Sequence, residues 1–379
     1  MRILIFSESF LPLRTGVAKF TYELALNLHK RGHDVVVLTA NFPDIPSTPF
    51  PVETVGEAGR IYANGSFTWF IKAPPWAVFR KFKEVIGRYG VEVFHNQGPL
   101  GPPYSMLSAH FVERIDPKIR RVGTFHSKRM RPTTTFKLLG RLLSPLVRRH
   151  HVLTAPSKST AEEMESLLHL RGVRVVPNAV DTDVFRPDNP PLPDLQDGRK
   201  TALFVGRLDE RKGIDTLMEA WRRLNGAGDF RRAHKLVVVG DGPLKGHVLD
   251  VAEETGNVLL YDNVPMGDPN FPRFYTSADF AVFPAKGGEA FGIVILEAFA
   301  SGRPVIISDI PGYNEVATPE TALLVPPDSP EGLARAMARM FSDDEMRRRM
   351  GERALTRARE FSWDSVIGRF LDLYQSIPK

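Results

Sequence analysis

The chain has 379 residues, which is more than one typical hydrophobic core needs and enough for two domains. Its 42% hydrophobic and 25% charged residues are typical of a soluble globular protein. The absence of cysteine excludes disulfides and thiolate metal sites, and it fits a reducing, cytoplasmic setting. No apolar run approaches the length of a membrane span, and the opening MRILIFSESF predicts a strand rather than a signal peptide.

The charge is distributed unevenly along the chain. Residues 1–190 contain 26 Lys and Arg against 16 Asp and Glu, whereas the remainder contains 24 against 28. Residues 117–150 carry ten basic side chains and no acidic one. This asymmetry indicates an anionic partner for the first half, such as membrane phospholipid, nucleic acid or a phosphorylated substrate, or else a solvated basic face.

Short apolar runs alternate with helical patterns in the first half of the chain. A helix is predicted over 17–32, with Gly32 as its C-cap. Continuous Val and Leu runs indicate a parallel sheet buried on both faces. The predicted strands are 2–7, 34–40, 91–95, 121–126, 151–156 and 173–178.

A loop rich in Pro and Asp at 181–200 predicts a linker, after which the alternation restarts. The second set of predicted strands is 201–206, 235–240, 257–261, 280–284, 304–308 and 322–326. We therefore expect an α/β protein with two Rossmann-like doubly wound domains that face each other across a cleft. The predicted domains are 1–183, with the final helix (361–379) packed back onto it, and 184–360.

The segment GRLDERKG places two cations where ligands of open parallel sheets bind. Arg207 follows a predicted strand and Lys212 precedes a predicted helix, so both are expected at the carboxyl edge of the sheet. A helix start adds a positive end, and the combination predicts a pyrophosphate clamp. The alternative is that both are ordinary surface residues.

The segment KGGEAFGIVILEAFASG (286–302) contains two glutamates eight positions apart. Gly287 and Gly288 allow backbone to approach a ligand closely, and AFGI opens a helix whose first N–H groups can bind phosphate oxygens. If helical throughout, the stretch separates Glu289 from Glu297 by roughly 12 Å, which suits an extended nucleotide sugar. Alternatively, Glu289 caps the helix and Glu297 pairs with an arginine.

Two other motifs are rejected as functional signals. The DTD triplet (181–183) resembles a metal-binding D-x-D motif but lies in the predicted linker. The run VVVGDGP (237–243) does not complete G-x-G-x-x-G, so it does not predict a nicotinamide cofactor.

Basic and aromatic residues are interleaved in two helical segments of the first half. The segment FRKFKEV (79–85) carries Arg80, Lys81 and Lys83, with Trp76, Phe79 and Phe82 alongside, a mixture typical of an interfacial helix. The segment 135–151 combines basic residues with a leucine stripe, which is equally typical of a core helix. That stripe consists of Leu139, Leu142, Leu143 and Leu146, with Lys137, Arg141 and Arg148 elsewhere.

The motif EAFGIVILE is an E-x₇-E motif. Together with GRLDERKG, VPNAVDTDVF and GVAKFTYELALNLHKRGH, it resembles the family 4 retaining glycosyltransferases of the GT-B fold, over almost the whole chain. Within that family the chain looks closest to the phosphatidylinositol α-mannosyltransferases. The segments that carry this likeness are FRKFKEVIGRYGVEVFHNQGPLGPPYSML, TFHS and GGEAFGIVILEAFASG.

The resemblance implies roles for individual residues. Arg207 and Lys212 would neutralise the donor diphosphate, Glu289 would contact the transferred sugar, and Glu297 would bind the ribose. His126, in GTFHS, matches the family's active-site histidine. Further donor contacts are expected from Gly16, from the backbone N–H groups of Phe291, Gly292 and Ile293, and from a base pocket around 261–271 that includes Val264.

The first loop, LPLRTGVAKF, departs from the family pattern. Thr15 stands where the family has the first glycine of a pair, and only Gly16 remains, so the loop conformation requires a negative φ at Thr15. The acceptor is expected near this loop. The residues expected to contact acceptor or membrane are Thr15, Arg80, Lys81, Lys83, Lys128, Arg129 and Arg131.

The resulting hypothesis is an enzyme at the inner face of the cell membrane that is held there peripherally. It would move a hexose, with mannose from GDP-mannose as the best candidate, onto an inositol phospholipid, without a metal or other cofactor and without binding nucleic acid. The alternatives are a UDP-sugar enzyme acting on another lipid or a soluble acceptor, a nucleotide-sugar-binding protein without turnover, and an anionic-polymer-binding module.

Overall fold

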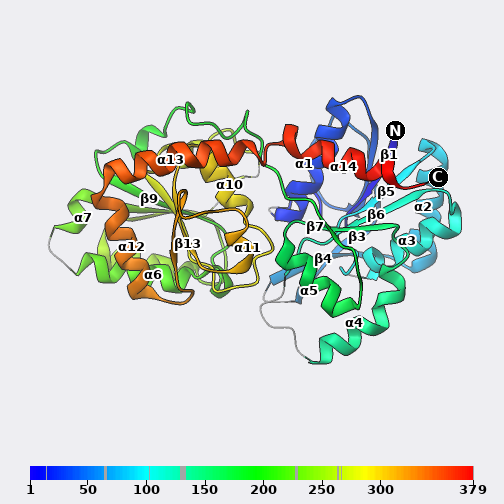
Figure 1. Ribbon diagram of the computed structural model, residues 1–379, viewed down its shortest axis with the longest axis horizontal. Helices are drawn as coiled ribbons and strands as arrows, with labels where there is room; N and C mark the ends of the chain where they lie inside the picture. The colour runs from blue at the N-terminus through cyan, green and yellow to red at the C-terminus, as the bar shows by residue number, and fades with distance from the viewer. Residues whose placement is uncertain are drawn as a thin grey trace. The chain divides into compact units, whose positions relative to one another are not determined.

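The chain forms two compact units, Met1–Asn178 with Asp364–Lys379, and Ala179–Trp363. Each is an α/β unit in which helices flank a sheet (Figure 1), which confirms the predicted α/β class. The limits differ slightly from the predicted 183/184 and 360/361. The computed structural model describes residues 1–13, 15–63, 66–101, 103–128, 134–226, 229–262, 264–265 and 267–378, without the side chains of 62, 63, 66, 67 and 134–139.

The first unit is built on an eight-stranded sheet in the order β4-β3-β2-β1-β5-β6-β7-β8. All described pairings are parallel except β3 with β4. The strands are β1 (Arg2–Phe6), β2 (Asp34–Asn41), β3 (Val52–Ala63), β4 (Ser66–Lys72), β5 (Val93–Asn96), β6 (Arg120–Thr124), β7 (Val152–Ala155) and β8 (Arg174–Val175). Its helices are α1 (Gly16–Lys30), α2 (Pro75–Tyr89), α3 (Pro103–Ile115), α4 (Thr134–Val147), α5 (Lys158–Leu168) and α14 (Trp363–Ser376).

Strands β3 and β4 were not predicted. They form an antiparallel pair at one edge of the sheet, and β3 includes Gly56, Gly59 and several charged residues. An edge strand needs no continuous apolar run, because it is not enclosed like the central strands of a parallel sheet. At the other edge, β8 has two residues where a strand over 173–178 was predicted.

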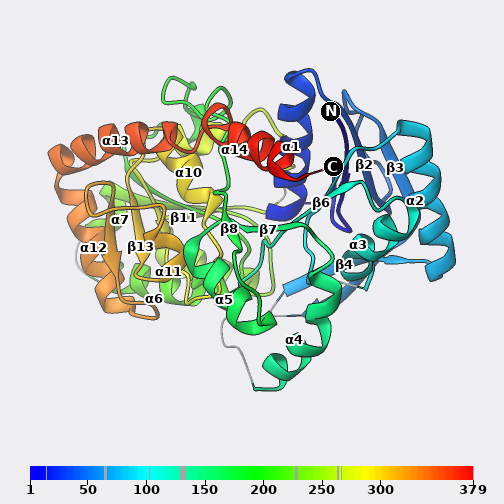
Figure 2. The same cartoon turned by 45° about the vertical axis from the view of Figure 1, so that its right-hand side comes forward.

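Helix α14 packs on the first unit, as the final helix was expected to do. The Tyr374 hydroxyl lies 2.7 Å from His95 Nδ1, and the Phe370 ring lies 6.1 Å from that of Phe20 on α1. Arg31, just after α1, pairs with Asp364 at 2.5 Å. Both views show α14 beside α1 (Figures 1 and 2).

A buried polar chain connects α14 with three strands of this sheet. His95 on β5 bonds Tyr374 through Nδ1 and Thr124 on β6 through Nε2, each at 2.7 Å. Thr124 Oγ1 lies 2.7 Å from Thr154 Oγ1 on β7. Burial lowers the pKa of His95 well below its ordinary value, so the imidazole is neutral and can take part as both donor and acceptor.

The second unit contains a six-stranded parallel sheet in the order β11-β10-β9-β12-β13-β14. Its strands are β9 (Lys200–Val205), β10 (His234–Val239), β11 (Val258–Tyr261), β12 (Phe280–Phe283), β13 (Val305–Ser308) and β14 (Ala322–Val325). The chain proceeds outward from β9 to β11, returns beside β9 and then proceeds from β12 to β14 in the other direction. The strand order therefore reverses between β9 and β12, which is where open α/β sheets bind ligands at their carboxyl edge.

Helices cover both faces of the second sheet and bury two apolar clusters, one containing Phe283, Ile295 and Phe299, the other Phe204, Trp221 and Phe280. The helices are α6 (Ile214–Asn225), α7 (Phe230–Ala233), α8 (Lys245–Thr255), α9 (Phe271–Thr276), α10 (Ile293–Ala300), α11 (Pro311–Asn314), α12 (Pro330–Ser342) and α13 (Asp344–Arg359), with 3₁₀ turns η1 (Pro193–Leu195) and η2 (Glu210–Lys212).

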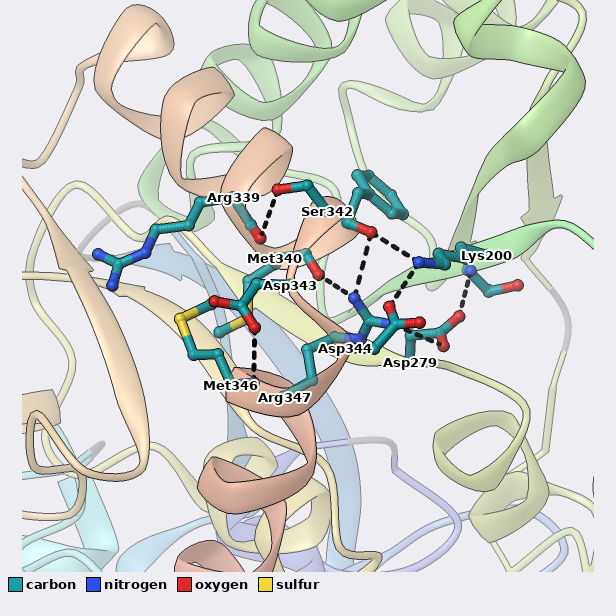
Figure 3. A network of polar contacts seen from close by, with 11 residues as sticks. Lys200, Asp279, Arg339, Met340, Ser342, Asp343, Asp344, Met346 and Arg347 are labelled. Atoms are coloured by element: carbon teal, nitrogen blue, oxygen red, sulfur yellow. Dashed lines mark hydrogen bonds and ion pairs between the residues drawn. The ribbon is translucent and has the colours of Figure 1, made fainter.

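The amino edge of the second sheet is closed by a polar network at the α12–α13 junction (Figure 3). Lys200 Nζ bonds Asp344 at 2.5 Å and the Phe341 carbonyl at 2.9 Å. Asp279 accepts from the Thr201 amide at 2.7 Å and lies 3.7 Å from Arg347. These cations and carboxylates pair with one another, so the charged side chains at this edge are accounted for by the fold itself.

The buried histidines make the stability of the first unit depend on pH. Burial lowers the pKa of His150 to about 4, and its Nδ1 lies 2.9 Å from the Val147 carbonyl oxygen. Between pH 6.5 and about 4 the unfolded chain binds a proton that folded His150 does not, so stability falls as the pH falls. The loss from His150 alone is expected to reach about 3 kcal/mol.

Urea unfolding at several pH values between 7.5 and 4.5 would measure this slope. We expect His150→Gln to make it shallower, and His29→Gln, which changes an exposed histidine, to leave it unchanged. An identical slope in all three proteins would contradict the assignment.

Candidate active site

Two loops meet at the reversal point of the second sheet, one after β9 (206–213) and one after β12 (284–292). The strands themselves are neighbours, with Leu203 opposite Ala281. The Lys286 amide donates to the Arg211 carbonyl at 2.9 Å. Gly213 has a φ of +69°, and a Cβ there would lie 1.9 Å from the Pro284 carbonyl oxygen. Only glycine allows the two loops to approach this closely.

Glu289 is a buried carboxylate held by cations of the β9 loop. Its Oε2 accepts from Lys212 Nζ at 2.9 Å, and its Oε1 lies 3.8 Å from Arg211 Nη2. Burial by itself favours the neutral acid, but Lys212 and Arg211 outweigh it and hold the pKa of Glu289 below its ordinary value. Its Oε1 is buried and accepts no hydrogen bond from the residues that the structure describes, so its capacity to accept one is unused.

The predicted cations lie on the β9 loop, each beside an acid. Arg207 Nε donates to Asp209 at 3.0 Å, and the Arg207 side chain is 34% exposed. Asp209 also accepts from the Lys212 amide at 3.0 Å as the N-cap of η2. Neither Asp209 nor Arg211 was among the predicted site residues. An Asp three residues before Lys212 is an N-cap signal that could have identified the first.

Helix α10 begins directly after the glutamate loop. Gly292 is its N-cap with a φ of +99°, and Phe291 is buried with its ring 5.7 Å from that of Phe361. The first N–H groups of α10, including that of Ile293, have no partner within the helix. Glu289 precedes the helix and does not cap it, so the capping alternative is wrong. The premise of the 12 Å estimate, a continuous helix from Glu289 to Glu297, is also wrong, because α10 begins at Ile293.

Glu297 lies one turn inside α10 and is buried. The hydroxyl of Tyr275, on α9, donates to Glu297 Oε2 at 2.5 Å. Burial and the neighbouring Glu297 carboxylate raise the pKa of Tyr275 well above its ordinary value, so the hydroxyl keeps its proton as a donor. Val264, predicted in the base pocket, is half-buried against the apolar cluster that contains Tyr275. Tyr275 was missed because nothing in the sequence places a tyrosine 22 residues away beside Glu297.

In the first unit, His126 lies two residues beyond the end of β6. Its Nε2 is 2.7 Å from Gln97 Oε1, just after β5, and its ring packs 4.9 Å from that of Phe20. Burial lowers the pKa of His126 to about 4, so the imidazole is neutral at physiological pH. Gln97 was not predicted, although its position just after a strand is the same signal that identified His126.

The first loop adopts the backbone conformation that Thr15 requires. Thr15 has a φ of −118°, and its Oγ1 accepts from the Ala18 amide at 3.2 Å as the N-cap of α1, while Gly16 is exposed. Thus the expected negative φ is confirmed. Thr15, which stands where the family has a glycine, also caps α1. Between β1 and this loop, Glu8 is buried and accepts from the amides of Ile71 at 2.8 Å and Ser105 at 2.7 Å.

The predicted membrane residues differ in their surroundings. Arg80 lies over the exposed ring of Trp76, 5.4 Å from its centroid, and Lys83 is exposed. Lys81 instead pairs with Glu53 at 2.7 Å and Glu84 at 3.1 Å, so its charge is balanced within the fold.

The other residues expected at the membrane surface are buried, half-buried or outside the described part of the chain. Phe82, expected beside the cations at an interface, is fully buried, which corrects that expectation. Lys128 is half-buried. Arg129, Arg131 and the side chains of Lys137 and Leu139 lie outside the described residues.

The described residues include no group of three or more His, Asp or Glu side chains that could hold a metal ion. In the DTD triplet, Asp181 accepts from the amides of Asp183 and Val184 at 2.9 and 3.2 Å, which is a turn. Among all the residues that the structure describes, no helix is long and apolar enough to cross a bilayer.

Two α/β units, each built on a largely parallel sheet, with two loops in close contact at the reversal point of the second sheet, have the architecture of the GT-B glycosyltransferases. The family described as "Glycosyltransferase Family 4" matches residues 14–184, and "Glycosyl transferases group 1" matches residues 186–357. The chain belongs to the family 4 glycosyltransferases, as the sequence motifs indicated.

Characterised relatives span nearly the whole chain. A phosphatidyl-myo-inositol mannosyltransferase from Mycolicibacterium smegmatis is 29% identical, covering 96% of this chain and 90% of its own. One from Mycobacterium tuberculosis is 30% identical, covering 96% and 93%. A D-inositol 3-phosphate glycosyltransferase from Corynebacterium glutamicum is 33% identical over 57% of this chain and 56% of its own.

Solved structures share the fold. Sucrose-phosphate synthase from Thermosynechococcus elongatus has a TM-score of 0.74 with 21% identity, covering 98% of both chains. Anabaena HepE in complex with UDP has a TM-score of 0.75 with 15% identity, covering 100% of both.

The approach of Gly213 to Pro284 yields a stability prediction. We expect Gly213→Ala to lower the free energy of unfolding of the second unit by about 2 kcal/mol or more, because the added Cβ meets a carbonyl and φ is positive. Gly246→Ala, in α8 with open space around it, is the control and should be neutral or stabilising by up to about 1 kcal/mol. Equal urea midpoints for the two variants would contradict this account.

Proposed function

We propose that this glycosyltransferase transfers mannose from GDP-mannose to the headgroup of an inositol phospholipid, with retention of configuration. The observation that carries the proposal is the similarity to phosphatidyl-myo-inositol mannosyltransferases over 96% of the chain. The ion-paired Glu289 loop at the reversal point of the second sheet supports it, because such a loop can hold both a sugar and a diphosphate.

In this proposal the donor lies along the loops after β9 and β12. Arg207 and Lys212 neutralise the diphosphate, with the N–H groups at the start of α10 as further donors. Glu289 Oε1 accepts a hydrogen bond from a sugar hydroxyl. Glu297 accepts one from a ribose hydroxyl, while the Tyr275 hydroxyl donates to Oε2 of the same carboxylate. We expect no metal requirement, because these cations provide the positive charge that a metal provides elsewhere.

The reaction would break the bond between the anomeric carbon and the phosphate oxygen, and form a bond to the acceptor oxygen on the same face of the sugar. The acceptor proton passes to the departing phosphate oxygen, so no side-chain base is required. The charged state of Glu289 fits this scheme: the carboxylate stabilises positive charge that develops on the sugar ring. His126 is a neutral imidazole and serves as a hydrogen-bonding partner of the substrate rather than as a cation.

A lipid acceptor implies attachment to the membrane surface. We propose that the exposed end of α2 provides part of it, since Trp76, Arg80 and Lys83 combine an aromatic side chain with two cations. Lys81 is not included, because it is paired with Glu53 and Glu84. The inner face of the cell membrane is the expected location.

A soluble inositol phosphate is the second candidate acceptor. It is favoured by the 33% identity with a D-inositol 3-phosphate glycosyltransferase over about half of the chain. The donor in that case could be a UDP-sugar.

The first experiment incubates the enzyme with labelled GDP-mannose and phosphatidylinositol vesicles and counts label in the organic phase. We expect incorporation that depends on the inositol lipid and persists in EDTA. Parallel reactions would contain inositol 3-phosphate with UDP-sugars. Label in the aqueous product alone would replace the first proposal by the second, and loss of activity in EDTA would contradict the absence of a metal.

The role of Glu289 is tested by Glu289→Gln, which preserves shape and removes the charge. We expect kcat/KM to fall about a hundredfold or more, since a preorganised charge at the reacting sugar is lost. Glu254→Gln, on the exposed side of α8, is the matched control and should retain full activity. A Glu289→Gln enzyme as active as the control would exclude Glu289 from the donor site.

A further inference from the structure

A basic pocket lies on the first unit, apart from the residues assigned above. Its volume is about 420 Å³, and it is formed where α4 and α5 end and where β7 and β8 begin. Its lining includes no Asp or Glu. The Arg and His side chains that line it are Arg148, His150, His151, His169, Arg171 and Arg174. The lining residues directly follow the C-termini of α4 and α5, and these two helices lie side by side in both views (Figures 1 and 2).

The pocket is at the amino edge of the first sheet. His151 directly precedes β7, and Arg174 is the first residue of β8. His126 follows β6 and is therefore at the opposite, carboxyl edge. The four residues of β7 span about 13 Å at the usual rise, so the pocket is separate from the expected acceptor region.

Capping of helix C-termini explains part of this basic cluster, but not all of it. Arg148 donates to the carbonyl of His169, which ends α5, and its Nε donates to Ser144 Oγ at 2.9 Å. Arg174 makes one long contact, 3.5 Å to Ser376 Oγ. Arg171 is exposed and has no hydrogen bond or ion pair with the residues that the structure describes. Arg171 and Arg174 thus have no acidic partner among the residues that the structure describes.

The nearby carboxylates are already engaged. Glu113 pairs with Arg149 and lies 3.6 Å from Arg121. Glu165 Oε1 accepts from the Val173 amide at 2.9 Å. The positive potential of the pocket is therefore not balanced by an acid in its lining.

We propose that this pocket binds a phosphate group, as a monoester or diester, at a site distinct from the donor site. Guanidinium groups suit this ligand because their planar N–H pairs match two phosphate oxygens. The phosphate could belong to a soluble compound or to an anionic phospholipid. A more open groove continues from Arg148 past Arg141 and Pro145, and the neighbouring Leu142 is 70% exposed. This combination of cations with apolar side chains favours the lipid.

The test is calorimetric titration with inorganic pyrophosphate of the wild type, of Arg171→Ala/Arg174→Ala, and of a control, Arg231→Ala/Arg232→Ala, which removes two exposed arginines of the second unit. Binding of pyrophosphate at the donor site is expected to be the same in all three proteins. We expect the pocket variant alone to lose one binding event, or to weaken it about tenfold or more. All four arginines are exposed, so unchanged thermal unfolding is expected to show that the variants are folded. Three identical isotherms would overturn the proposal.

Sedimentation with phosphatidylinositol vesicles, and with neutral phosphatidylcholine vesicles as the reference, distinguishes the two sources. If the pocket variant loses both pyrophosphate and anionic-vesicle binding, the ligand is a lipid headgroup. If it loses pyrophosphate binding alone, the ligand is soluble. If vesicle binding falls while pyrophosphate binding is unchanged, the arginines act as unspecific surface charge, and the phosphate pocket is wrong.

Discussion

The contact between Lys212 and Glu289 unites the two loops that make the donor region of this protein. A buried carboxylate is costly unless a cation and hydrogen bonds compensate it. Here Lys212 and Arg211 supply the compensation, and they can reach Glu289 because Gly213 lets the β9 loop lie directly against Pro284. The position of the carboxylate, its charge and the direction of its unpaired oxygen all depend on this close approach of backbone to backbone.

The two edges of the second sheet use charge differently. At the amino edge, Lys200, Asp344, Arg347 and Asp279 pair among themselves and tie α13 to the sheet. At the carboxyl edge, Arg207 keeps a partly exposed side chain, and Glu289 keeps an oxygen without a hydrogen bond. Self-contained pairs stabilise structure, whereas partly satisfied groups can exchange their partners for a ligand. In the first unit the amino edge is instead the one with unpaired charge: arginines without an acidic partner among the described residues lie there, whereas the buried histidines of this unit are neutral.

Much of this arrangement was predictable from the sequence. The strands of the second sheet follow from continuous apolar runs, because both faces of a parallel sheet are buried. The loop positions of Arg207, Lys212 and Glu289 follow from the sequence, because Arg207 comes just after a predicted strand, Lys212 just before a predicted helix, and Glu289 in the glycine-led segment that opens the next one. The pair β3–β4 was missed because an edge pair has no such run. Asp209 and Gln97 carried local signals, yet each signal also fits many ordinary turns and strand ends.

The sequence by itself determined the α/β class, the presence of two successive α/β units, the family and the charged residues of the loops. These properties depend on local pattern and on the order of the predicted elements. Only the tertiary structure decided the partners. Tyr275 meets Glu297, Glu53 neutralises Lys81, and Arg148, Arg171 and Arg174 line one pocket. These contacts join residues from different elements, and no local pattern reports which elements will pack together. Charge that the sequence presents as one basic region is therefore divided by packing into paired side chains and a concave site.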